Sequence, residues 1–131
     1  MSDNACRLSK RDLLRLADGL LEPEPQVIGL CVEFVLAETR GVWHGRARAM
    51  MCRRLKHCDL EPAQRAGLVD GILQRLASGN FSEQFKDQLR LALLLDGARS
   101  LRVAADCEAD GRSRPHARRY ARWVLAHRNA G

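Results

Sequence analysis

The side chains best suited to chemistry in this 131-residue chain are clustered cysteines and histidines. Cys52, His57 and Cys58, with His44 in the same segment, are residue types that bind zinc. Five residues separate the two cysteines and His57 adjoins Cys58, which is not the spacing of a zinc knuckle. We interpret them as structural thiols and a histidine at a helix end, so we expect no metal.

Two further groups of titratable side chains also lack the pattern of an active site. His116 and His127 lie three turns apart on one predicted helix, too far to bind one ion together. Glu33 and Glu38 fall on an apolar predicted helix, where Glu33 occupies the polar strip. The sequence contains no Gly-rich phosphate loop, no His-Glu-x-x-His and no nucleophile elbow. We therefore predict no enzyme, no catalytic residue and no cofactor.

Charge is the sharpest feature of the sequence. Arg40–Lys56 and Arg112–Arg128 each carry six of the 22 basic residues and no acidic residue, while the whole chain is +6. The rest of the chain is therefore a mildly acidic scaffold. The partner-binding candidates lie on the two predicted helices in these segments. Those of the first helix lie opposite Trp43, and those of the second lie opposite Tyr120 and Trp123. These candidates are Arg46, Arg53, Lys56, Arg118, Arg119 and Arg122.

The two cationic helices would form one patch if they face the same way. Arginine binds carboxylates and phosphates bidentately, so the patch suits an acidic protein surface or a nucleic-acid backbone. We predict a non-catalytic interaction module that binds a protein partner or a second copy of itself. Sequence-nonspecific nucleic-acid binding is the alternative, and a solvated basic face without a partner is the third interpretation. Exposed apolar side chains beside Arg118–Arg122 would favour a protein partner.

Composition predicts an all-α protein. Leu, Ala and Arg are abundant while β-branched and aromatic residues are few, which favours helix. We expect a single helical domain over about residues 9–128, with a flexible N-terminus at 1–8 and a frayed end at 129–131. No secretory signal or membrane span is evident, and five irregularly spaced cysteines suit a reducing compartment. The prediction is a cytoplasmic location.

We expect seven helices from the periodicity of the apolar residues and from the Pro and Gly residues that begin or end helices. Ser9 is a predicted N-cap, Gly79 a stop, and Asn80 with Glu83 a capping box for the fifth helix. The end of that helix, including Leu94, is predicted to be buried on most sides. The predicted ranges are about 9–22, 25–38, 42–57, 59–78, 80–95, 98–107 and 113–128.

An offset of 72 residues aligns parts of the two cationic segments. His44, Arg46 and Ala49 face His116, Arg118 and Ala121, and Arg40 faces Arg112. The match indicates either an internal repeat or the bias of a sequence rich in Arg and Ala. Two units of about 36 residues come near the length of HEAT and armadillo repeats. Tetratricopeptide and ankyrin patterns are absent.

On this ground the chain, from about Ser9 to Arg128, resembles a short HEAT-like helical array of three hairpins plus one helix. The resemblance implies antiparallel hairpins stacked in a right-handed array, with a compact multi-helical bundle as the alternative. It also implies a binding surface and no chemistry, because such arrays present one face to a partner.

Overall fold

The computed structural model describes residues 8–37, 39–41, 43–81 and 84–127. These residues form seven α-helices and no strand, which confirms the prediction of an all-α protein with about seven helices. None of the helices in this part of the chain is long and apolar enough to cross a membrane. Apart from Leu8, the expected flexible N-terminus and frayed C-terminus lie outside the described residues.

The chain divides into two compact units, residues 1–68 and 69–131, and each is described by itself. The division falls inside helix α5, Pro62–Ser78. We predicted a single domain, built as a helical array or as a compact bundle. Both points depend on how the two units are placed relative to each other, so they stay predictions.

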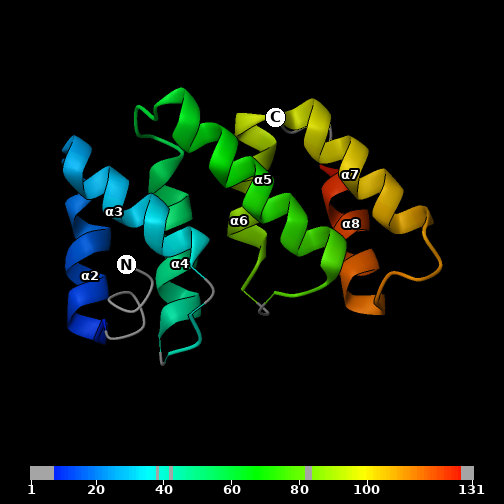
Figure 1. Ribbon diagram of the computed structural model, residues 1–131, viewed down its shortest axis with the longest axis horizontal. Helices are drawn as coiled ribbons and strands as arrows, with labels where there is room; N and C mark the ends of the chain where they lie inside the picture. The colour runs from blue at the N-terminus through cyan, green and yellow to red at the C-terminus, as the bar shows by residue number, and fades with distance from the viewer. Residues whose placement is uncertain (1–7, 38, 42, 82–83, 128–131) are drawn as a thin grey trace. The chain divides into compact units, whose positions relative to one another are not determined.

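The first unit contains three helices that all pack against one another: α2 (Lys10–Gly19), α3 (Pro25–Leu36) and α4 (His44–Leu55). Helices α2 and α4 run in the same direction and α3 returns in the opposite direction (Figure 1). The predicted cap of the first helix is confirmed. The Asp12 backbone N–H donates to Ser9 Oγ at 3.2 Å, and the Ser9 backbone N–H donates to the Asp12 carboxylate at 3.1 Å.

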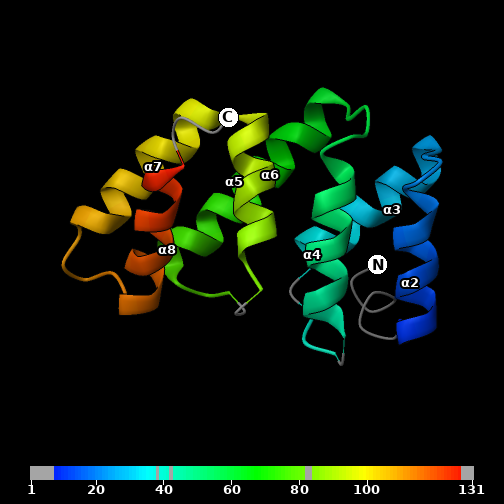
Figure 2. The same ribbon diagram turned by 180° about the vertical axis from the view of Figure 1, so that it is seen from behind.

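The second unit contains α6 (Lys86–Leu95), α7 (Gly97–Ala109) and α8 (Pro115–Ala126), and again each helix packs against the other two. The directions repeat, since α6 and α8 run together while α7 returns (Figure 2). Gly79 ends α5 with φ +73°, a left-handed conformation that glycine adopts without steric cost, as predicted.

Helix α6 starts later than the sequence predicted. The expected capping box at Asn80 is wrong, because α6 begins at Lys86. Glu83, the other half of that box, lies outside the described residues. The Phe81 and Phe85 rings stack with their centroids 4.2 Å apart, and the Tyr120 ring meets Phe81 edge-on at 5.1 Å. These ring contacts pack Phe81 and Phe85 against α8 ahead of the first turn of α6.

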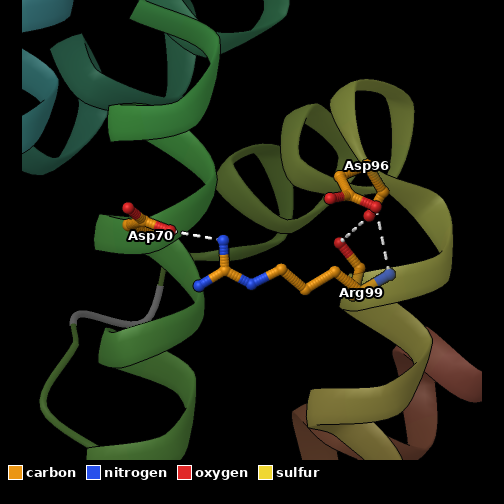
Figure 3. Close-up of polar contacts among 4 residues, drawn as sticks. Asp70, Asp96 and Arg99 are labelled. Atoms are coloured by element: carbon orange, nitrogen blue, oxygen red, sulfur yellow. Dashed lines mark hydrogen bonds and ion pairs between the residues drawn. The ribbon is translucent and has the colours of Figure 1, made fainter. Parts of the chain in front are cut away.

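The start of α7 is fixed by Asp96. Its carboxylate accepts a hydrogen bond from the Arg99 backbone N–H at 3.1 Å, and its carbonyl accepts one from the Ser100 hydroxyl at 2.8 Å. The Arg99 side chain then extends to an ion pair with Asp70 on α5 (Figure 3). The cap thus fixes the first turn of α7, from which the exposed Arg99 side chain reaches Asp70.

A close approach at Gly41 provides a stability prediction. A Cβ at this position would lie 2.6–2.9 Å from three ring atoms of His44, whose side chain is buried. We expect G41A to lower the free energy of unfolding by about 1–3 kcal/mol, because the ring cannot retreat. Urea denaturation, monitored by circular dichroism, measures this change in the free energy of unfolding.

The matched control is G97A. Gly97 is the first residue of α7, and nothing lies within 4 Å of an added Cβ. Alanine there should leave stability unchanged or raise it by about 0.4–1 kcal/mol. Equal effects of the two substitutions would contradict the packing around His44.

Candidate functional site

The six predicted partner-binding residues are divided between the two units. Arg46, Arg53 and Lys56 belong to the first unit, and Arg118, Arg119 and Arg122 belong to the second. The merging of both sets into one patch stays a prediction.

Helix α8 has one buried face and one cationic face. Ala117, Ala121 and Val124 are fully buried. Arg119 and Arg122 are exposed, and neither forms an ion pair with another residue that the structure describes. Because no acidic residue occurs after Asp110, the charge of this helix is not neutralised along its own segment.

Arg118 differs from its two neighbours. It is half-buried, and its Nε donates a hydrogen bond to the Glu108 carbonyl at 3.2 Å. This bond ties α8 to the end of α7, so Arg118 has a structural contact that Arg119 and Arg122 lack.

Cations from a second helix gather around Trp123 of α8. The Lys86 ammonium lies 5.7 Å and the Arg90 guanidinium 5.3 Å from the centroid of the Trp123 ring. The His127 ring lies 4.1 Å from the same ring, and His127 Nδ1 bonds to the Trp123 carbonyl at 2.7 Å. These contacts hold the cations in place while Trp123 itself stays half-exposed.

Leu94 extends this arrangement along α6. Lys86, Arg90 and Leu94 are spaced four residues apart and form one exposed stripe, in which Leu94 is 53% exposed. The prediction that this end of the helix is buried on most sides is therefore wrong at Leu94. Arg119 precedes Trp123 by four residues on α8, so it lies on the same side of the helix, and the expectation that it lies opposite Trp123 is wrong. Arg122 adjoins Trp123 in the sequence and is exposed. We name the surface made by Lys86, Arg90, Leu94, Arg119, Arg122 and Trp123 the Trp123 surface.

The first unit holds a related arrangement around Trp43. The Lys10 ammonium lies 4.2 Å and the Arg46 guanidinium 5.2 Å from the centroid of the Trp43 ring. The expectation that Arg46 lies opposite Trp43 is therefore wrong. Trp43 precedes α4 in a left-handed conformation, with φ 72°, so helical spacing does not describe its direction. Lys10, Trp43 and Arg46 are named the Trp43 surface.

The remaining two candidates lie elsewhere on α4. Arg53 is exposed in its last turn, and Lys56 is a half-buried C-cap residue. Both are at the end of α4 opposite to Trp43, so the structure does not gather Arg46, Arg53 and Lys56 at one place.

Arg48 is a cation that the sequence did not mark as structural. Only 8% of it is exposed, and its guanidinium donates to the carbonyl and the hydroxyl of Thr39 and lies 5.1 Å from the Phe34 ring centroid. His44, 1% exposed, bonds through Nδ1 to the Thr39 hydroxyl at 2.6 Å and through Nε2 to the Leu8 carbonyl at 3.2 Å. Arg48, one of the six cations of Arg40–Lys56, thus belongs to a buried polar network with Thr39 and His44.

His116 makes the corresponding contact in the second unit. Its Nε2 bonds to the Gly79 carbonyl at 2.7 Å, and its ring lies 4.9 Å from that of Phe81. A carbonyl only accepts, so Nε2 carries the proton in both histidines. These nitrogens are engaged in holding the fold.

The thiols are also enclosed by the fold. Cys31 and Cys52 are fully buried, and burial raises the pKa of the Cys31 thiol to about 12. Burial also raises the pKa of the half-buried Cys58, whose Sγ donates to the Arg54 carbonyl at 3.4 Å. Within the described ranges, no three His, Cys, Asp or Glu side chains are grouped to hold a metal ion.

The contrast between Arg48 and Arg119 gives a second prediction. R48A should lower the free energy of unfolding by about 1–3 kcal/mol, because the Thr39 carbonyl loses its buried donor. R119A, at an exposed position, should change it by less than about 0.5 kcal/mol. Thermal and urea denaturation of the two variants test this, and a large loss in R119A would show that its charge serves the fold.

No protein-family model matches the chain, and comparison with curated proteins and with solved structures gives no significant match.

Proposed function

We propose that the chain is a non-catalytic helical interaction module that binds an acidic protein segment through the Trp123 surface. The observation that carries this proposal is the juxtaposition of cations with the exposed Leu94 and the half-exposed Trp123 on packed helices. Protein interfaces combine an apolar or aromatic anchor with a charged rim in this way.

Charge supports an acidic partner. The second unit contains eleven basic and seven acidic residues, and Lys86, Arg119 and Arg122 have no ion-pair partner among the residues that the structure describes. Arg90 is paired with Asp87 at 3.2 Å, although 48% of its side chain is exposed. Carboxylates of a partner would approach cations that the cation–π contacts have already positioned.

The environment of Trp123 favours a protein over a nucleic acid. Three side chains, Lys86, Arg90 and His127, already approach its ring, which leaves less of the ring for a stacked base. Leu94 adds an exposed apolar side chain, which phosphate binding does not use.

We also propose that the two units are copies of one helical repeat, in line with the HEAT-like resemblance. Helix α7 begins at Gly97, 72 residues after Pro25, and α8 begins at Pro115, 71 residues after His44. His44 and His116 bond to carbonyls 36 and 37 residues before them. The four described cysteines are free thiols, which supports the expected cytoplasmic location.

The test uses a fluorescein-labelled peptide that carries glutamates on one helical face and leucines on the other. Fluorescence anisotropy should show saturable binding that weakens as salt is raised. R119E/R122E should weaken binding about tenfold or more, because both cations become carboxylates that repel the peptide.

The charge-matched control is R65E/R102E, which reverses two exposed arginines outside the Trp123 surface. It should bind as the wild type does. A glutamate peptide without leucines should bind more weakly than the amphipathic one. The proposal fails if neither peptide binds, or if labelled single-stranded or duplex DNA binds tightly and loses affinity in R119E/R122E.

A further inference from the structure

The two tryptophans of the chain have matching surroundings in the two units. Lys10 is the first residue of α2 and Lys86 is the first residue of α6, and each places its ammonium over the ring of its unit's tryptophan. An arginine guanidinium also lies over each ring, from Arg46 in the first unit and Arg90 in the second. Each surface therefore has one lysine and one arginine held against a tryptophan.

We infer that the Trp43 surface is a second binding site for the same kind of acidic segment, so that the chain binds one segment in each unit. This inference rests on the proposed function of the Trp123 surface. Lys10 and Arg46 are exposed, and neither forms an ion pair with another residue in the described part of the first unit. The ammonium and guanidinium groups can therefore bind carboxylates, and the Trp43 ring already restricts their positions.

The backbone at Trp43 is an independent observation for this site. Trp43 has φ 72°, and it is the one residue other than glycine with a positive φ in the described ranges. This conformation is unfavourable for a bulky residue, so it persists only where the surrounding structure enforces it, and such residues cluster at functional sites. In this conformation the half-exposed Trp43 ring faces the cations of both α2 and α4.

The two surfaces differ in their apolar component, which sets the expected order of affinity. Leu94 belongs to the exposed stripe of the Trp123 surface, whereas the contacts that define the Trp43 surface include no exposed leucine. The Trp43 site should therefore bind the amphipathic peptide more weakly, and charge should account for more of its affinity.

The tryptophans themselves are reporters for the experiment. W123F leaves Trp43 as the single tryptophan, and W43F leaves Trp123. Titration with the amphipathic glutamate–leucine peptide, without its label, should change the fluorescence of both variants to saturation. Isothermal titration calorimetry of the wild-type chain should give two peptides per chain.

Charge-neutral variants assign each binding event without removing a ring. K10Q/R46Q should weaken binding at Trp43 about tenfold or more and leave one peptide per chain. K86Q/R90Q should likewise leave one peptide per chain; combined with W43F it should remove the response of Trp123, and combined with W123F it should retain that of Trp43. Circular dichroism and urea denaturation establish that each variant is folded.

The outcomes separate this inference from the proposed function. One peptide per chain, with a response from Trp123 alone, would overturn the second site and leave the proposed function standing. Two peptides per chain in K10Q/R46Q would also overturn it, because the second site would lie elsewhere. No binding at all would overturn both.

Discussion

Each unit depends on one hydrogen bond that a histidine makes to a distant backbone carbonyl. The histidine lies near the start of the unit's third helix, α4 or α8, and the carbonyl precedes its first helix, α2 or α6. His44 bonds to the Leu8 carbonyl and His116 to the Gly79 carbonyl. In the first unit the bond continues inward, since Nδ1 of His44 accepts from the Thr39 hydroxyl, which accepts in turn from Arg48. Fixing one end of the third helix in this way determines which of its faces meets solvent.

The charged surfaces follow from that orientation. The inner side of α8 is built from small residues, Ala117 and Ala121, which allow close packing, and Arg119 between them must then face outward. The cations around each tryptophan include the first residue of the first helix, Lys10 or Lys86. The same packing that closes a unit thus brings a cation of its first helix to the tryptophan of its third helix or of that helix's N-cap.

Periodicity and capping rules predicted the helices but not the directions of several side chains. The cap at Ser9 and the stop at Gly79 are local features, and both are confirmed. The predicted direction of Arg46 relative to Trp43 is wrong because Trp43 has φ 72°, so a regular helix does not run through it. Arg48 is one of the six cations of its segment, and its contacts with Thr39 form only in the folded unit. No local signal in the sequence identifies a buried arginine of this kind.

The central claim is that an acidic partner segment contacts the cations around the tryptophans, and the chain's three lysines allow a direct test. Lys10 and Lys86 belong to the two surfaces, whereas Lys56 caps the far end of α4. Acetylation of the full chain, followed by mass spectrometry with and without the glutamate–leucine peptide, measures the access to each amine. Slower acetylation of Lys86 and Lys10, with an unchanged rate at Lys56, is the predicted result. Equal rates with and without peptide at all three lysines, or protection of Lys56 alone, would contradict the claim.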